Sequence, residues 1–243
     1  MSDLNEKIEE LKNIISNSNN IVFFGGAGVS TESGIPDFRS VDGLYNQKYK
    51  YPPETILSHT FYRSYPEEFF RFYKDKMLYT DAEPNTTHKA LAKLEEMGKL
   101  KAVITQNIDG LHQKAGSKKV LELHGSVLRN YCEKCHTFHD LDYMISADGV
   151  PTCKKCGGRV KPDVVLYEEG LDDNTIQESV NFIRNCEVLI IGGTSLGVYP
   201  AAGLIDYYRG NKLILINKSS TPKDNYANLI INDSLGNVFS QVI

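Results

Sequence analysis

The sequence has no apolar run that approaches the ~20 residues of a membrane-spanning helix. Residues 1–20 alternate charged and apolar side chains, so they do not resemble a secretory signal. Lysines and arginines are scattered and the net charge is -4, which leaves no basic patch for the phosphates of nucleic acid. We therefore expect a cytoplasmic protein that binds neither membranes nor nucleic acid directly.

Tryptophan, internal repeats and low-complexity tracts are also absent. Of the residues, 41% are hydrophobic and 24% are charged, with 19 glycines and 9 prolines in 243 positions. These values are typical of folded globular proteins and exclude disordered and collagen-like chains. A chain of this length can bury one large core and a smaller module.

Short apolar runs alternate with amphipathic helical patterns along most of the chain. Helical spacing of apolar residues begins at residues 4–15 and returns at 90–97 and 176–183. Such an alternation predicts an α/β fold with a doubly wound parallel sheet. The predicted strands lie at residues 21–24, 102–104, 120–123, 188–191 and 213–216.

Two stretches interrupt this alternation. Residues 36–80 are rich in Tyr, Phe and Pro and are predicted to form a helical and loop insertion. Residues 129–160 carry four of the five cysteines and few residues that could form a core. We expect each stretch to belong to a second, smaller lobe.

The four cysteines form two closely spaced pairs. Two residues separate the cysteines within each pair and seventeen separate the pairs. This spacing is typical of a four-thiolate zinc site, whereas two disulfides are the competing interpretation. Reduced thiols in the cytoplasm favour zinc, and four sulfur ligands leave the ion a structural role. The predicted ligands are Cys132, Cys135, Cys153 and Cys156.

Two glycine-rich turns follow predicted strands. In the first, Gly26, Ala27 and Gly28 could present backbone amides to a pyrophosphate, with Ser30 or Thr31 capping a helix. Thr31 stands where the usual dinucleotide fingerprint has its third glycine, and no strand with a terminal acidic residue follows. This departure argues against a hydride-transferring dehydrogenase. The second turn spans residues 192–197, and for either turn structural tightness alone is an open alternative.

A polar segment begins where the second predicted strand ends. Gln106, Asn107 and Asp109 are costly to bury, so they either cap local backbone or face a polar ligand. His124 similarly follows a strand and precedes a glycine. A structural role for this histidine and a role as a base are both compatible with its position.

Together these motifs make a specific combination. They are GAGVSTESGIPDFR at residues 26–39, TQNIDGLH at 105–112, LHG at 123–125, the paired cysteines, and GTS at 193–195. In this order, from about residue 20 to the end of the chain, they resemble the sirtuin family of NAD-dependent protein deacylases. The resemblance implies a Rossmann-like NAD-binding domain at residues 1–35, 81–128 and 161–243, and a small zinc-binding and helical domain at 36–80 and 129–160.

The resemblance also implies which residues bind NAD in the cleft between the two domains. The first motif is expected to line a loop over NAD, the second to hold the nicotinamide and its ribose, and the last to contact the adenosine side. The implied residues are Gly26, Ala27, Gly28, Thr31, Asp37, Phe38, Arg39, Gln106, Asn107, Ile108, Asp109, His124, Gly193, Thr194, Ser195, Asn217 and Asp233.

The implied reaction transfers an acetyl group from lysine to ADP-ribose. Nicotinamide leaves the ribose, the lysine amide oxygen attacks the same carbon, and polar groups that exclude water support the developing charge. His124 is the implied general base for the ribose hydroxyls, and Asn107 and Asp109 complete the implied catalytic set. The products are free lysine, nicotinamide and 2'-O-acetyl-ADP-ribose.

An acetyl-lysine protein or peptide is the implied partner, added as a strand beside two loops. The implied contacts are Val164, Val165, Leu166, Tyr167 and Val198. Family members that accept acidic acyl groups carry a Tyr and an Arg at positions that align with Phe70 and Tyr73. An apolar acyl pocket, and hence acetyl, is therefore expected.

Two other functions remain compatible with the sequence. One is a protein ADP-ribosyltransferase that uses the same fold and NAD. The other is a catalytically silent NAD-sensing or zinc-ribbon interaction module.

Overall fold

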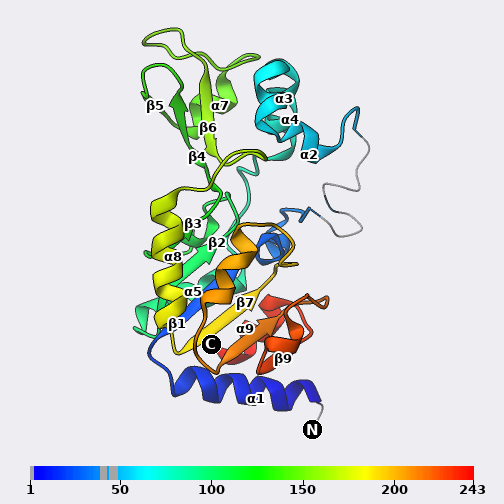
Figure 1. The fold of residues 1–243 in the computed structure, drawn as a ribbon, viewed down its shortest axis with the longest axis vertical. Helices are drawn as coiled ribbons and strands as arrows, with labels where there is room; N and C mark the ends of the chain where they lie inside the picture. The colour runs from blue at the N-terminus through cyan, green and yellow to red at the C-terminus, as the bar shows by residue number, and fades with distance from the viewer. Residues whose placement is uncertain (1–2, 39–42, 44–48) are drawn as a thin grey trace.

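A computed structural model describes residues 3–38, 43 and 49–243. Figure 1 shows two lobes, with a large sheet and its helices in one and a small sheet beside short helices in the other. Within the described residues, no helix is both long enough and apolar enough to cross a membrane.

The large lobe contains a six-stranded sheet in the order β3-β2-β1-β7-β8-β9. Every strand pair in it is parallel, which confirms the predicted doubly wound α/β fold. The five predicted strands are present, and β9 is an additional strand that the sequence analysis missed because three apolar residues are too few to identify one. The strands are β1 (Ile21–Gly25), β2 (Leu100–Thr105), β3 (Val120–Glu122), β7 (Val188–Gly192), β8 (Leu213–Ile216) and β9 (Leu229–Ile231).

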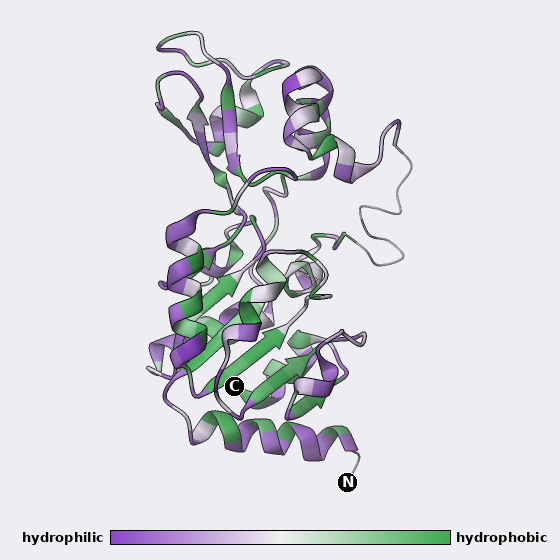
Figure 2. Cartoon of the chain, viewed as in Figure 1, coloured by the Kyte–Doolittle hydropathy of each residue, from purple (hydrophilic) through white to green (hydrophobic). Residues whose placement is uncertain are grey.

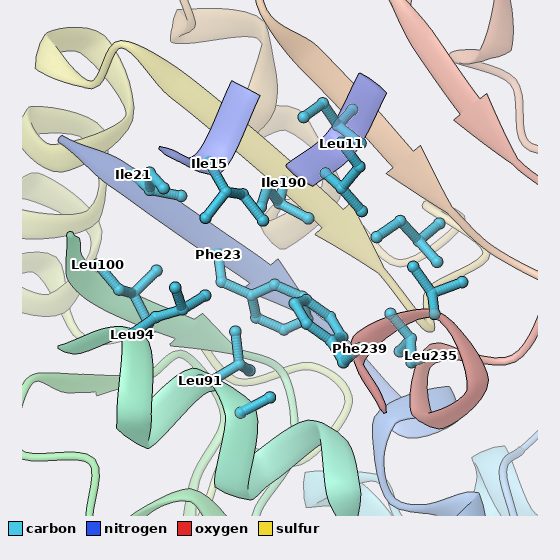
Figure 3. Close-up of a cluster of buried hydrophobic side chains, with 14 of the residues drawn as sticks. Leu11, Ile15, Ile21, Phe23, Leu91, Leu94, Leu100, Ile190, Leu235 and Phe239 are labelled. Atoms are coloured by element: carbon cyan, nitrogen blue, oxygen red, sulfur yellow. The ribbon is translucent and has the colours of Figure 1, made fainter. Parts of the chain in front are cut away.

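Helices cover both faces of this sheet because alternate strand residues point to opposite sides. Phe23 of β1 packs with α1, α5 and α9, and its neighbour Phe24 packs with α8 and the 3-10 helix η4. Figure 3 shows Phe23 between Leu91 and Phe239 in the first of these cores, and Figure 2 shows the apolar strands enclosed by more polar helices. The elements are α1 (Asp3–Ser16), α5 (Thr86–Glu96), α6 (Leu111–Lys114), α8 (Asp173–Asn185), η4 (Ala201–Tyr207), η5 (Asp224–Tyr226) and α9 (Leu235–Val242).

The small lobe combines an antiparallel sheet in the order β5-β4-β6 with the helical insertion. Its core joins aromatic residues of the helices to Cys132 and Cys153 of the sheet region. Strands β4 and β6 each cross a predicted domain boundary, and those boundaries stay a prediction. The elements are α2 (Pro53–Ile56), α3 (His59–Ser64), α4 (Pro66–Lys76), β4 (Gly125–Cys132), β5 (Phe138–His139), α7 (Leu141–Ser146) and β6 (Val160–Val164).

The sheet order positions the candidate site. Strand β1 pairs with β2 on one side and β7 on the other, so Gly25 lies opposite both Thr105 and Gly192. The strand order reverses direction at this point, and open parallel sheets bind ligands beyond the carboxyl ends of such strands. The two glycine-rich turns and the polar segment therefore leave the sheet side by side.

Candidate active site

A cleft of about 1040 Å³ lies at these strand ends and extends to the small lobe. Arg39 lies outside the described residues, and every other predicted NAD and peptide residue lines the cleft. These residues are Gly26, Ala27, Gly28, Thr31, Asp37, Phe38, Gln106, Asn107, Ile108, Asp109, His124, Val164, Val165, Leu166, Tyr167, Gly193, Thr194, Ser195, Val198, Asn217 and Asp233.

The two glycine turns touch each other through their backbones. The Gly28 amide donates to the Gly193 carbonyl oxygen at 2.8 Å, and Gly193 has a φ of 61°. A Cβ on Gly28 would lie 2.8 Å from the Cα of Gly193. The close contact between the two turns is therefore enough to require glycine at positions 28 and 193, with or without a bound ligand.

The predicted capping of a helix by Ser30 or Thr31 is wrong. Two short 3-10 helices follow Gly26, η1 (Ala27–Val29) and η2 (Thr31–Ser33), and neither has a side-chain cap. The Ser30 hydroxyl instead donates to Asp109 Oδ2 at 2.6 Å and accepts from Asn107 Nδ2 at 3.0 Å. Ser30 is a site residue that the sequence analysis missed, because its partners lie more than 70 positions away along the chain.

Backbone and side-chain bonds also fix the segment after β2. Asp109 Oδ1 accepts from the Leu111 amide at 2.9 Å, and Gln106 Nε2 donates to Thr194 Oγ1 at 3.1 Å. The amide of Asn107 donates to Thr105 Oγ1 at 3.0 Å. Asp109 therefore caps local backbone and lines the cleft at the same time, whereas the side chains of Gln106 and Asn107 bind side chains of the two glycine turns.

His124 occupies the tight turn between β3 and β4. Its Nδ1 lies 2.9 Å from the carbonyl oxygen of Gln106. Because a carbonyl oxygen only accepts, Nδ1 carries the proton and Nε2 retains its lone pair. Burial lowers the pKa of His124, against the opposing effect of the Gln106 bond. The imidazole is therefore neutral and able to accept a proton at neutral pH.

Asn217 and Asp233 follow the ends of β8 and β9 and line the cleft. Asn217 Nδ2 donates to the Thr194 carbonyl at 2.9 Å, which leaves its Oδ1 as the polar atom available to a ligand. Asp233 accepts from the Ser234 amide at 2.6 Å and from Asn237 Nδ2 at 2.5 Å. Both Asp233 oxygens thus have local partners at the start of α9.

The four cysteines converge in the small lobe and are not disulfide-bonded. Their sulfurs all lie within 4.8 Å of one another, with separations of 3.4 Å for Cys132–Cys156 and 3.7 Å for Cys135–Cys153. A tetrahedral zinc with bonds of about 2.3 Å places its sulfurs about 3.8 Å apart. The predicted four-cysteine site is confirmed and fits zinc.

The predicted peptide loop is held closely by its own chain. The amides of Val165, Leu166 and Tyr167 donate to the His124 carbonyl, to Glu169 Oε2 and to the Leu57 carbonyl respectively. The carbonyl oxygens of Leu166 and Tyr167 also accept, from the amides of Glu169 and His59. An added peptide strand would therefore pair at Val165, whose carbonyl oxygen accepts from none of these amides.

Two residues align with the positions at which some family members bind acidic acyl groups, and neither of them lines the cleft. Phe70 and Tyr73 are almost completely buried in the aromatic core of the helical insertion. Arg71 points to solvent and pairs with Glu68. Apolar side chains that do line the cleft include those of Phe38, Leu57, Ile108, Val127 and Leu166, of which all but Leu57 and Val127 were identified from the sequence.

Comparisons with known proteins agree with this architecture. A model of the Sir2 family matches residues 26–200. An NAD-dependent protein deacetylase of Clostridium perfringens (strain 13 / Type A) is 65% identical over 243 residues, covering 99% of this chain and 100% of the relative. A solved structure of Sir2 with a p53 peptide and NAD+ is 38% identical with a TM-score of 0.87, covering 97% of this chain and 96% of that one.

A further solved structure contains Sir2 with the inhibitor EX-527, 2'-O-acetyl-ADP-ribose and a deacetylated p53 peptide. It is 38% identical to this chain with a TM-score of 0.86, and the match covers 96% of both chains. The similarity thus extends over both lobes and over the motifs that converge on the cleft. The chain belongs to the Sir2 family.

Proposed function

We propose that this chain is an NAD-dependent protein lysine deacetylase that releases nicotinamide and 2'-O-acetyl-ADP-ribose. The observation that carries the proposal is the convergence of Asn107, Asp109 and His124 on one cleft at the reversal point of the sheet. A relative 65% identical over the whole chain carries the same activity in its name. A solved Sir2 structure at 38% identity holds the expected acetylated product.

The cleft has the groups that NAD would need. The glycine turns allow close approach of a pyrophosphate to backbone amides, and Thr194 and Ser195 follow the second turn. We assign the adenosine ribose to the free Oδ1 of Asn217. Asp233 supports the proposal less directly, because both of its oxygens are already bonded.

In this proposal the bound NAD supplies the ribose carbon that accepts the acetyl oxygen, and the chain supplies orientation and proton transfer. Ser30 holds Asn107 and Asp109 in fixed positions, so their dipole and charge are in place before nicotinamide leaves. The lone pair on His124 Nε2 would take a proton from the ribose diol. The zinc site lies outside the cleft lining and would keep the small lobe folded.

The substrate would be an acetyl-lysine protein or peptide. Backbone pairing with the loop at Val164–Tyr167 and with Val198 would give affinity with little dependence on peptide sequence. The apolar side chains of Phe38, Ile108 and Leu166 suit an uncharged acetyl group. The exposed position of Arg71 leaves it no part in binding an acidic acyl group.

We further infer the setting in which the protein works. Four cysteines kept as free thiols for zinc require a reducing compartment, which supports a cytoplasmic location. We also retain the two-domain division at residues 1–35, 81–128 and 161–243 against 36–80 and 129–160 as a proposal, with β4 and β6 as the connections between the domains.

Incubation with an acetyl-lysine peptide tests the proposal. With NAD we expect release of nicotinamide and equimolar 2'-O-acetyl-ADP-ribose by mass spectrometry, and without NAD we expect no turnover. His124→Ala should lower kcat by about 10²- to 10⁴-fold, as expected for loss of a general base. ADP-ribose attached to protein without acetyl-ADP-ribose would instead identify an ADP-ribosyltransferase, and no product of either kind would indicate a silent module.

A further inference from the structure

One side chain outside the cleft holds the turn that follows β1. Asn85 Nδ2 donates to the Val29 carbonyl oxygen at 2.7 Å and to Ser33 Oγ at 3.0 Å. Val29 and Ser33 lie on either side of Ser30, within the two short 3-10 helices of this turn. Asn85 itself is absent from the cleft lining, so it contacts the turn from behind.

The same side chain caps helix α5. Asn85 Oδ1 accepts from the Thr87 amide at 2.9 Å and from the His88 amide at 3.4 Å, while the Asn85 amide donates to His88 Nδ1 at 3.3 Å. Helix α5 is fixed to the sheet through residues such as Leu91, which is fully buried. Asn85 therefore uses its oxygen to cap a rigid helix and its nitrogen to hold the turn.

The held turn carries part of the site. Ser30 is buried, with 1% of its surface exposed. Its hydroxyl group connects the side chains of Asn107 and Asp109. A displacement of the turn would move Ser30 and would disturb both of these side chains. We propose that Asn85 is a positioning residue that sets the geometry of the NAD site through this turn. The inference rests on the proposed function and adds a residue to its machinery.

If Asn85 served only as a helix cap, replacing it with another good capping residue would leave NAD binding unchanged. Aspartate is as good a cap as asparagine, since it keeps the accepting oxygen, but it has no N–H to donate. Asn85→Asp should therefore keep α5 capped while it releases the Val29 carbonyl oxygen; the Ser33 hydroxyl can rotate and donate to the new carboxylate. We expect the KM for NAD to rise about tenfold, because the Val29 carbonyl oxygen loses its donor and faces a carboxylate oxygen that repels it. The KM for the acetylated peptide should stay within about twofold, because the peptide loop does not contact Asn85.

Two further variants separate positioning from stability. Asp172→Ala removes the cap of α8, which accepts from the Thr175 amide at 2.7 Å, and should lower the Tm without changing the KM for NAD. Ser33→Ala removes one acceptor of the Asn85 bond and leaves α5 intact. Ser33→Ala should raise the KM for NAD about two- to fivefold. If Asn85→Asp does not fold, this variant tests the positioning role of Asn85 in its place.

An unchanged KM for NAD in folded Asn85→Asp, or an equal rise in both KM values, would overturn the inference. Titration calorimetry with ADP-ribose gives a second measurement that needs no turnover, and binding to Asn85→Asp should be weaker than to the wild type. If the wild-type protein does not deacetylate the peptide, the proposed function is wrong. The calorimetric comparison of the wild type with Asn85→Asp would still test the role of Asn85 in ligand binding.

Discussion

His124 is held in one protonation state by a single hydrogen bond and by burial. Its Nδ1 must donate to the Gln106 carbonyl, so the second nitrogen is left as the base. Burial lowers the pKa because the positive form loses hydration in the cleft. The fold thus favours the neutral, proton-accepting form of the residue.

The pH dependence of turnover follows from this lowered pKa. A base whose pKa lies below the ordinary value of 6.5 remains neutral to lower pH, so kcat should hold its plateau to a lower pH than with an ordinary histidine. The acid limb should then have a midpoint below 6.5, measured as nicotinamide release at saturating NAD and peptide. A midpoint above that value would mean that the deprotonation step belongs to another group or that His124 is exposed in the complex.

At the scale of elements, the two glycine turns form one structural unit. In Gly28→Ala the new Cβ meets the Gly193 backbone at 2.8 Å, and a backbone atom cannot rotate away. The turns must separate, so we expect at least a tenfold higher KM for NAD and a loss of about 1–3 kcal/mol in stability. Gly170→Ala is the matched control, because nothing lies within 4 Å of its Cβ. Equal effects of the two substitutions on KM would contradict this explanation.

The zinc module allows a second comparison of matched residues. Cys132 and Cys186 are both buried, yet only Cys132 belongs to the four-sulfur cluster. Cys132→Ser should lose bound zinc, measured by atomic absorption, and should unfold the β4–β6 sheet and lower activity indirectly. Cys186→Ser should retain one zinc per chain. Full activity of metal-free protein would show that zinc is not needed for the fold.

Elements with a strong local pattern could be predicted from the sequence, and contacts between distant elements could not. The apolar run of β7 and the spacing of α8 identified those elements directly. Strand β9 is too short to stand out, and it depends on β8 beside it for its hydrogen bonds. The motifs located the segments that form the site, whereas the roles of Ser30, inside the first motif, and of Asn85 depend on partners that only the folded chain brings near.

At the scale of the whole molecule, two neutral histidines lie buried behind the site. The rings of His88 and His112 are 4.7 Å apart and edge-on, and both residues are almost completely buried. Burial lowers the pKa of His88 to about 4, against the nearby charge of Asp109. Burial, together with His88, lowers the pKa of His112 to about 3. Both residues regain an ordinary pKa near 6.5 when the chain unfolds.

Acid should therefore destabilise the fold through these two residues. As the pH falls from 6.5 toward 4, the unfolded chain binds protons that the folded chain does not, so the free energy of unfolding decreases. Each histidine contributes about 1.4 kcal/mol per pH unit in this range. Urea unfolding at pH 7 and at pH 5 measures the slope, and His112→Phe should reduce it by about one histidine equivalent. His88 Nδ1 accepts from the Asn85 amide only when unprotonated, so the start of α5 should loosen only near and below pH 4, where the folded chain begins to protonate His88. A slope that His112→Phe leaves unchanged would assign acid sensitivity to other groups, such as the zinc thiolates.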